Sequence, residues 1–564
     1  MSPTSSDPWP GSAGPPAAAA GPHPEVAVPA ELVGPAEVDV PNEVLVPAVV
    51  VGAGPAGMAA AVALAEAGVA VHVLDTYTQP GGQYHRTRAG GLAPTHPDPV
   101  VRSYLHHLDV GTVTHHPGTT VWTATVDEQA GTPDRPPSFA LHLAGVAGHE
   151  APAATMRTEV VVLATGATDR VLPFPGWDLP GVVTVGAAQA LLKGQGVRVG
   201  DRVVVGGSGP FLLPVAAALA EVGTHVVTVA EAQPATALAR ATSLTGAAPL
   251  AWQHRRTLAE GAGYAATLAR HRVPIATATA VTAARGDGRL EEVTLSRLAP
   301  DWSPLPGAER TEAVDAAAVS FGFVPQVGLA ALLGCRLVAD PDWGDPVAEV
   351  DGHQTTSVPG VFAAGEVTGV AGAPAAAAEG ALAGLAAAHH LGAIDVEALR
   401  GRGRRHRRDR AARRTFAAAL GRAYARGDGW VDWLTDDTLV CRCEEVDHAT
   451  VRAAIAEHGA SDLRSVKLTT RCGMGMCQAR MCGDAVATLV AHHTRTPASD
   501  LGALSTPTVL TPVPLRQLAA LALAGIDCLP EALTRDAAAP PTRAMLSGVA
   551  GRAGAQGTAT DQAG

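Results

Sequence analysis

Residues Ala48–Asp75 read AVVVGAGPAGMAAAVALAEAGVAVHVLD, and the rest of the chain is organised around them. A short β-branched run leads into three spaced glycines, an alanine-rich run of helical length, a second apolar run and an acid. Strand, glycine turn, helix, strand and acid in this order are the context in which G-x-G-x-x-G predicts a dinucleotide-binding unit. Asp75 is placed to accept a ribose hydroxyl. We therefore prefer this interpretation to an ordinary βαβ turn with incidental glycines.

Each residue of the turn has an expected role in holding a dinucleotide. Gly52 permits the tight turn, Gly54 lets the backbone approach a pyrophosphate, and Gly57 lets helix and strand pack closely. The helix N-terminus, which begins with Pro55 and Ala56, presents free N–H groups to the phosphates.

Composition narrows the class of protein. The chain has 564 residues, of which 47% are hydrophobic and 17% charged, which predicts about three or four domains with large cores. A net charge of −12 and an aromatic content of 4% argue against nucleic-acid binding. The sequence contains no run of 18 apolar residues, so we expect no transmembrane helix. The N-terminus does not have the pattern of a secretory signal.

The cysteines indicate the compartment. Five of the seven lie between Cys441 and Cys482. Clustering of this kind is typical of a metal or cluster site in a reducing cytoplasm, whereas a disulfide scaffold would spread its cysteines. We therefore expect a cytoplasmic protein.

Two later stretches are expected to pass close to the first cofactor. Gly82 and Gln83 belong to a Gly-Gly turn that would let the backbone run beside a flavin, with a surface turn as the alternative. A buried strand then ends at Ala164, Thr165 and Gly166, where a fold with two dinucleotide-binding domains brings the chain back to the first cofactor.

A third stretch, Val361–Ala364, reads as a strand that delivers Gly365 and Glu366 into an Ala/Gly-rich helix. The acid can accept flavin ribityl hydroxyls, and the following helix can point its N-terminus at the flavin ring. The alternative is a plain strand–turn–helix. His85 and Arg86 follow the Gly-Gly turn that would run beside the flavin, but we favour surface positions for both. We identify no catalytic acid or base.

Arg202–Glu231 repeats the plan of the opening stretch and predicts a second nucleotide-type domain. Gly207 and Gly209 fit the glycine pattern, but Leu212 occupies the third glycine position. Binding of NAD(P) and a vestigial fold are both compatible with this change. Glu231 would favour a free ribose over a 2′-phosphate if a nucleotide binds.

The second strong signal is Cys441-x-Cys443 followed by Cys477-x4-Cys482. Four thiolates, two from a tight turn and two from a second loop, suit a [2Fe–2S] cluster. Structural zinc is the alternative, although the C-x2-C knuckles that zinc sites favour are absent. Cys472 lies in the same loop and leaves the ligand set open, because its use would release Cys477 or Cys482.

The surroundings of the cysteines predict a small helical module. Gly473 and Gly475 free the backbone to curl around the cluster and donate N–H···S bonds, and Ala449–Gly459 has helical spacing. Before the module, Arg402–Arg414 carries eight arginines and one aspartate. We interpret it as a solvated basic connecting helix rather than a nucleic-acid or membrane surface, because the whole chain is acidic.

Together these motifs resemble a family of FAD/[2Fe–2S] subunits. It comprises the opine oxidase A subunit, the hydrogen cyanide synthase B subunit, D-hydroxyproline dehydrogenases and the sarcosine oxidase alpha subunit. The resemblance covers about residues 46–490 and rests on these stretches: VVVGAGPAGMAAA, PGGQYHR, VVLATGATDRVLPFPGWDLPGV, VGGSGPFLLPVAAALAEVG, GFVPQVGLA, VFAAGEVTGVAGA, DDTLVCRCEEV and TRCGMGMCQARMCG.

The resemblance implies an α/β protein with two Rossmann-like dinucleotide-binding domains, the second inserted in the first, and a small helical BFD-like [2Fe–2S] domain. The expected segments are a disordered tail (1–45), an FAD-binding domain (46–199 and 320–395), an NAD(P)-binding-like domain (200–319), a basic helical linker (396–435), the BFD-like domain (436–495) and a C-terminal extension (496–564) that is disordered after about 535.

The resemblance also implies site residues. FAD would be surrounded by Gly52, Gly54, Gly57, Asp75, Gln83 and Glu366, and the cluster would be held by Cys441, Cys443, Cys477 and Cys482. This sequence departs from the family at Cys472, where a small residue is more usual, and at Ala479, where a glycine is usual. Both departures lie in the cluster loop and bear on the ligand set more than on the fold.

The function implied is an FAD- and [2Fe–2S]-dependent oxidoreductase, namely the electron-relay subunit of an amine or imino-acid dehydrogenase or oxidase. The partner implied is a second flavoprotein subunit that oxidises an opine, D-hydroxyproline, glycine or sarcosine-type substrate. One alternative is a self-contained NAD(P)H-dependent flavoprotein reductase. Another is a non-enzymatic iron–sulfur sensor or iron-handling module.

Overall fold

The computed structural model describes residues 43–87, 92–93, 95–126, 138–146, 149, 151, 154–236, 255–497, 500–501, 509–514 and 518. The expected N-terminal tail, apart from its last three residues, lies outside these ranges, as does the segment after about 535. Within the described ranges, no helix combines the length and apolar character needed to cross a membrane.

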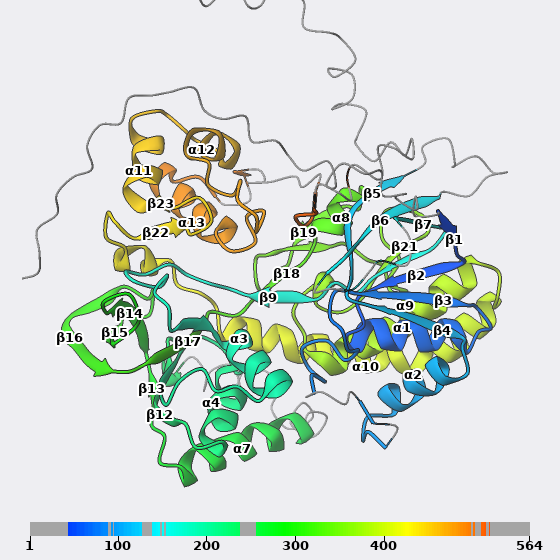
Figure 1. The fold of residues 1–564 in the computed structure, drawn as a ribbon, viewed down its shortest axis with the longest axis horizontal. Coiled ribbons are helices and arrows are strands. Elements are labelled where there is room, and N and C mark those ends of the chain that lie inside the picture. The colour runs from blue at the N-terminus through cyan, green and yellow to red at the C-terminus, as the bar shows by residue number, and fades with distance from the viewer. Residues whose placement is uncertain are drawn as a thin grey trace, which may run out of the picture. The chain divides into compact units, whose positions relative to one another are not determined.

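The first dinucleotide-binding fold is built on a parallel sheet with the strand order β21-β8-β2-β3-β4 (Figure 1). Its central strands are apolar on both faces because helices cover one face and a small antiparallel sheet packs on the other. Val50 is fully buried on the helix side and Val49 on the side of the small sheet. The elements are β2 (Ala48–Val51), α1 (Pro55–Ala65), β3 (Val71–Asp75), α2 (Pro99–Asp109), β4 (Val113–Pro117), β8 (Val161–Leu163), β21 (Val361–Ala363), η3 (Glu366–Thr368), α9 (Ala373–His390) and α10 (Val396–Ala423).

A small second sheet accompanies this fold. Strands β5, β6 and β7 form an antiparallel meander, and the short strand β1 pairs parallel with β7. A separate hairpin pairs β19 with β20. The elements are β1 (Val44–Leu45), β5 (Thr119–Val126), β6 (Phe139–Gly145), β7 (Thr155–Thr158), α8 (Gly328–Leu332), β19 (Leu337–Ala339) and β20 (Pro346–Ala348).

The second dinucleotide-type fold is inserted into the first, as predicted. The chain leaves through β9 (Ala167–Asp169) and returns through β18 (Phe323–Pro325), and these two strands pair antiparallel. Between them lie a parallel sheet of order β10-β17-β11-β12-β13 and an antiparallel sheet of order β14-β15-β16. The elements are β10 (Val182–Thr184), α3 (Val185–Ala190), η2 (Leu191–Gln195), β11 (Arg202–Gly207), α4 (Leu212–Glu221), β12 (His225–Glu231), α7 (Arg255–Arg270), β13 (Ile275–Thr277), β14 (Thr279–Arg285), β15 (Glu292–Leu298), β16 (Pro304–Ala313) and β17 (Ala316–Ser320).

A small helical module follows α10. Asp447 caps α11, and Asp462 caps α12 through a capping box with Ser465. Its elements are η4 (Gly429–Trp433), β22 (Leu439–Cys441), β23 (Val446–Asp447), α11 (His448–Ala456), α12 (Leu463–Thr470) and α13 (Gly483–Thr494). The described part of the C-terminal extension packs on the body, because Leu510 N donates to Trp122 O at 2.7 Å.

Helices α1 and α9 approach one another so closely that only small residues fit between them. A Cβ on Gly380 would lie 2.0 Å from Ala56 O, and one on Gly384 would lie 2.4 Å from Ala60 O. The alanine and glycine content of both helices is therefore a packing requirement rather than a sign of weak helices. The contact fixes α1, whose N-terminus follows the first glycine turn.

The basic helix α10 packs on α9 through a buried charge. Arg414 Nε donates to Glu379 Oε1 at 2.7 Å, and Arg410 Nε lies 3.5 Å from the same oxygen. The carboxylate is fully buried, and the two arginine side chains are only 26% and 24% exposed. The interpretation of this segment as a solvated helix is therefore wrong for Arg410 and Arg414.

We predict that Gly384→Ala destabilises the protein while Gly401→Ala does not. The added methyl at residue 384 meets α1 backbone, and overpacking of this kind costs about 1–3 kcal/mol. At residue 401, also inside a helix, nothing lies within 4 Å of the added atom, so alanine should stabilise α10 by up to about 1 kcal/mol. Chemical denaturation of both variants measures the difference, and equal midpoints would contradict the close packing.

Candidate functional site

The first glycine turn is held against the strand that returns from the meander. Gly52 has φ +105°, and a Cβ there would lie 2.3 Å from Ala164 O. A Cβ on Gly57 would lie 1.7 Å from Gly52 O. Neither position can accept a side chain without moving backbone, so both glycines have the structural roles expected of a dinucleotide turn.

Two further segments reach the same turn. Gly82 has φ +58°, and a Cβ there would lie 2.8 Å from Gly54 Cα. Gly365 has φ +82°, and its Cβ would lie 2.9 Å from Ala56 Cβ, beside Pro55 at the start of α1. The structure thus brings together predicted residues from four separate stretches at the N-terminus of α1, where free N–H groups can bind an anion.

Both predicted acids are held by main-chain donors. Asp75 accepts from Ala53 N at 3.3 Å and Tyr77 N at 3.1 Å. Burial raises the pKa of Asp75 to about 6. Glu366 accepts from Gly372 N at 2.8 Å, and burial raises its pKa as well. Each carboxylate keeps further lone pairs that can accept hydroxyl hydrogens.

Three other predicted residues, Thr165, Gly166 and Gln83, make hydrogen bonds away from the start of α1. Thr165 Oγ1 donates to Gln326 O at 2.7 Å, and Gln326 N donates to Gly166 O at 2.9 Å. These bonds tie the returning strand to the crossover near β18. Gln83 Nε2 donates to Tyr77 Oη at 2.8 Å on the exposed side of the turn.

Sequence reasoning missed Glu379. Its Oε2 accepts from Gly365 N and from Thr368 Oγ1, both at 3.0 Å, while Arg414 Nη2 bonds Thr368 Oγ1 at 2.7 Å. The carboxylate therefore fixes the turn that presents Glu366. A signal was available, since a single acid in an alanine-rich helix needs a partner when that helix is buried.

The residues near the flavin loop that were considered for catalysis have local partners. His85 Nε2 lies 3.5 Å from Asp98 Oδ2, and the guanidinium of Arg86 lies 4.4 Å from the ring centre of Tyr77. We assign neither a catalytic role.

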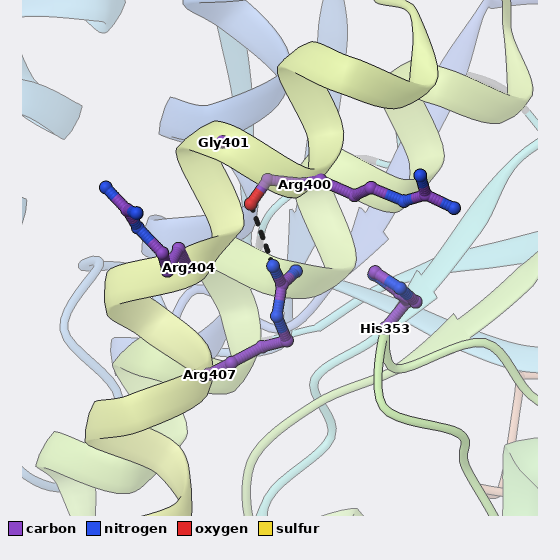
Figure 2. A pocket seen from close by; sticks show the side chains of 5 residues that line it. All are labelled: His353, Arg400, Gly401, Arg404 and Arg407. Atoms are coloured by element: carbon purple, nitrogen blue, oxygen red, sulfur yellow. Dashed lines mark hydrogen bonds between the residues drawn. The ribbon is translucent and has the colours of Figure 1, made fainter.

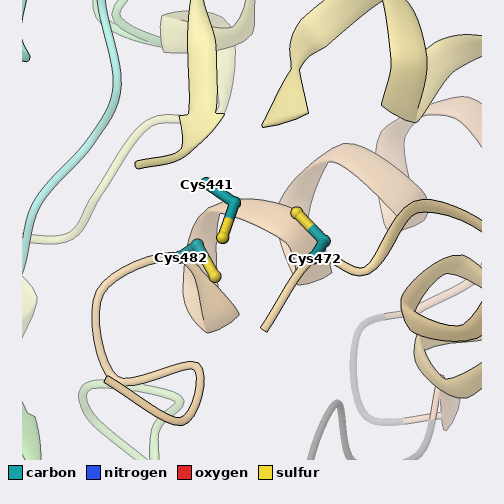
Figure 3. Close-up of side chains that lie close together, drawn as sticks. All are labelled: Cys441, Cys472 and Cys482. Carbon is teal, nitrogen blue, oxygen red and sulfur yellow. The ribbon is translucent and has the colours of Figure 1, made fainter. Parts of the chain in front are cut away.

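Three of the cysteine sulfurs converge in a buried position. The Sγ atoms of Cys441, Cys472 and Cys482 all lie within 4.8 Å of one another, and Figure 3 shows the three side chains gathered close together. Hydrogen bonds from Cys472 and Cys482 lower the pKa of Cys441 to about 2. The bond that each makes with Cys441 raises the pKa of Cys472 and of Cys482, so thiolate character is confined to Cys441. A compact set of three sulfur ligands fits a cluster or another soft metal centre.

The other two cysteines form a second group in the same region. Cys443 is exposed, Cys477 is half-buried, and the two are hydrogen-bonded to each other. A Cβ on Gly475 would lie 2.2 Å from Cys443 Cβ, so the loop can pass this cysteine only with glycine there. Gly473, at φ +83°, bonds Cys441 through its backbone, as expected of an N–H···S donor.

A buried charge network joins this module to the flavin-type fold. Arg170, which follows β9, has a side chain only 7% exposed. Its Nη2 donates to Asp345 Oδ1 at 2.6 Å, and its Nη1 contacts Asp484 Oδ2 at 2.7 Å. Arg426 binds the same Asp484 oxygen. Burial alone would raise the pKa of Asp484, but the two arginines hold it below its usual range.

Trp177 makes a second junction with the module. This buried residue of the crossover after β9 donates from Nε1 to Leu439 O at 2.6 Å, two residues before Cys441. The guanidinium of Arg442 lies 5.4 Å from its ring centre. The strand that carries the first cysteine is therefore attached directly to the inserted fold.

An open cationic cavity lies on α10, and no predicted site residue lines it. Its volume is about 640 Å³, and it is lined by His353, Arg400, Gly401, Arg404 and Arg407. Figure 2 shows the three arginines on one stretch of the helix, with Arg407 Nη2 bonded to Arg400 O at 2.8 Å. Among the described residues, none of the three has an ion pair. Arg400 and Arg404 are exposed, whereas Arg407 is half-buried and its Nη1 atom has no hydrogen-bond partner there.

Comparison with known proteins agrees with this arrangement. Residues 46–380 match the family model described as pyridine nucleotide-disulphide oxidoreductase, and residues 439–492 match that of the BFD-like [2Fe-2S] binding domain. The opine oxidase A subunit of Agrobacterium tumefaciens is 32% identical over 508 residues, which cover 84% of this chain and 91% of the relative.

Two further proteins extend the comparison. Hydrogen cyanide synthase subunit HcnB of Pseudomonas protegens is 31% identical over 436 residues, covering 77% of this chain and 89% of the relative. The structure of L-proline dehydrogenase from P. horikoshii shares the fold with a TM-score of 0.57 at 17% identity, covering 85% of this chain and 80% of that one. The chain therefore belongs to the pyridine nucleotide-disulphide oxidoreductase family, and it is an FAD-dependent oxidoreductase with a BFD-like [2Fe–2S] domain.

Proposed function

We propose that this chain is the electron-relay subunit of a complex that oxidises an amine or imino acid. The observation that carries the proposal is the combination, in one chain, of a dinucleotide turn built from four segments and a thiol-lined loop. Arg170 ties the two folds together through Asp345 and Asp484. The substrate class follows the relatives, which are named as subunits of opine oxidase and hydrogen cyanide synthase.

The chain's own residues would divide the binding of the two cofactors. Gly52, Gly54 and Gly57 would let the backbone approach the FAD pyrophosphate, and Asp75 and Glu366 would accept its hydroxyls. When bound, FAD supplies two-electron oxidation and the cluster supplies one-electron transfer. Glu379 would keep the turn before Glu366 in place through its bond to Gly365 N.

We further propose that the cluster is held by Cys441, Cys443, Cys477 and Cys482. The motif spacing supports this set, and so does the hydrogen bond between Cys443 and Cys477, which joins the two cysteine loops. Cys443 is exposed, and an exposed thiol without a ligand is prone to oxidation. In this assignment Cys472 is a fifth thiol that packs beside two ligands.

A second protein and a cytoplasmic location complete the proposal. The relatives are named as subunits, and among the described residues near the turn we assign no catalytic acid or base, so a second flavoprotein subunit would oxidise the substrate. The clustered thiols favour the reducing cytoplasm.

We predict that Cys443→Ala abolishes the cluster and Cys472→Ala keeps it. Loss of a ligand thiolate removes a bond to iron, whereas loss of a neighbouring thiol leaves the four ligands in place. Iron and sulfide analysis with EPR of the reduced protein measures cluster content. Cys335→Ala is the control, because Cys335 is buried beside Thr356, outside the cysteine loop. A cluster lost in Cys472→Ala but retained in Cys443→Ala would reverse the assignment.

We also predict that the complex purified from its native host couples amine oxidation to reduction of the cluster. An opine, sarcosine, glycine or D-hydroxyproline, added under anaerobic conditions, should bleach the flavin and produce the EPR signal of a reduced [2Fe–2S] cluster. The chain purified alone should not respond to the same substrates. Full activity of the lone chain would contradict the need for a partner, and no response of the complex to any amine would contradict the substrate class.

A further inference from the structure

The two glycine turns of the chain differ in how their helices begin. In the first fold, α1 begins at Pro55, directly after Gly54. In the second fold, α4 begins only at Leu212, three residues after Gly209. The N–H of Leu212 donates to Gly209 O at 3.2 Å, and its side chain is buried. The N–H of Leu212 is therefore engaged within the turn. At a regular helix start, this donor would be free to bind a pyrophosphate.

Phe211 gives this turn a further internal contact. Its ring packs on Phe323 of the returning strand β18, with 5.2 Å between ring centres. The turn is therefore closed on the chain's own crossover, whereas the corresponding position after Pro55 is the small residue Ala56.

The acid of the second fold is covered by the segment that follows α10. Glu231, at the end of β12, accepts from Gly209 N at 3.0 Å and from Gln233 N at 2.9 Å. Buried Gln233 donates from Nε2 to Ala425 O at 2.6 Å. Ala425 thus lies beside the acid-bearing end of β12, where a nucleotide ribose would bind.

The same segment continues into the module that carries the cysteines. Arg426 binds Asp484 through Nη1 and Thr488 Oγ1 through Nη2, the latter at 3.3 Å. Asp484 lies in the first turn of α13, two residues after Cys482. One short segment therefore contacts the second fold through Ala425 and helix α13, which follows Cys482, through Arg426.

A continuous apolar core joins the two parts as well. Trp430 and Trp433 belong to the same buried cluster as Trp302 and Phe321 of the second fold. Trp433 Nε1 donates to Trp302 O at 2.9 Å. The cluster extends to Cys441, Cys472 and Cys482, so the second fold and the module share one core among the described residues.

We propose that the second dinucleotide fold is not an NAD(P)H site but the platform that carries the [2Fe–2S] module, with residues 424–426 closing its ribose-binding end. The inference goes beyond the electron-relay role and does not depend on which substrate is oxidised. A nucleotide entering this fold would have to displace Ala425 from Gln233 and so disturb Arg426 beside the cluster helix.

The first test is binding of NADH and NADPH to the full chain loaded with FAD, so that the first site is filled. Calorimetry should show no saturable binding, and the flavin should not bleach on anaerobic mixing with either nucleotide. Saturable binding that Glu231→Gln abolishes, or rapid bleaching, would overturn the proposal. Neither result bears on amine oxidation, so the electron-relay role is tested separately.

The second test compares Arg426→Gln with Arg422→Gln. Arg422 also pairs with an aspartate, Asp342 at 3.2 Å, but its side chain is 57% exposed and it contacts no part of the module in the described structure. Loss of the buried Arg426 contact should speed removal of iron by a chelator by about threefold or more, because local opening exposes the cluster, while Arg422→Gln should match the wild type. Equal rates in both variants would overturn the platform role.

Discussion

The arrangement of this chain depends on the buried guanidinium of Arg170. Asp345 and Asp484 bind it from two different folds. The network contains two arginines, Arg170 and Arg426, and two aspartates, so removing either aspartate would leave an uncompensated positive charge. Breaking a buried pair in this way costs about 3–5 kcal/mol. The network therefore has a specific geometry, in which α13 is placed against the crossover after β9. Because α13 begins directly after Cys482, the same contact sets the position of the cluster loop relative to the flavin-type fold.

Inside the first fold, close contact between backbone segments fixes the positions of the residues around the glycine turn. The glycine turn, the return at Ala164 and the turn before Glu366 all meet at the start of α1, and α9 is held against α1 by Gly380 and Gly384. Glu379 then connects this packing to α10 through Arg414. Small residues bring the segments together. The buried Glu379 carboxylate, paired with Arg410 and Arg414, fixes the helix that leads toward the module. The inserted fold joins the same body through the apolar core that it shares with the module.

Much of this could be predicted from the sequence because the signals are local. Gly52, Gly54, Gly57 and Asp75 stand at fixed spacings within one βαβ unit, and the paired cysteines mark a cluster loop in the same way. Glu379, Arg170 and Asp484 could not be placed, since each acts on a partner far away in the chain. The arginines of α10 show the same limit: their composition suggests a solvated helix, but which of them turn inward depends on where Glu379 lies. The convergence of Cys472 with Cys441 and Cys482 likewise depends on how two loops fold together.

The central claim is that the flavin and the cluster are held in one body at a fixed separation. The most direct measurement is the rate of electron transfer from reduced flavin to the cluster in the purified chain, recorded in buffers of increasing viscosity. A fixed body predicts a rate that does not change with viscosity, because no domain motion precedes transfer. A rate that falls in proportion to viscosity would show that the module must move before it accepts an electron, and would contradict the account.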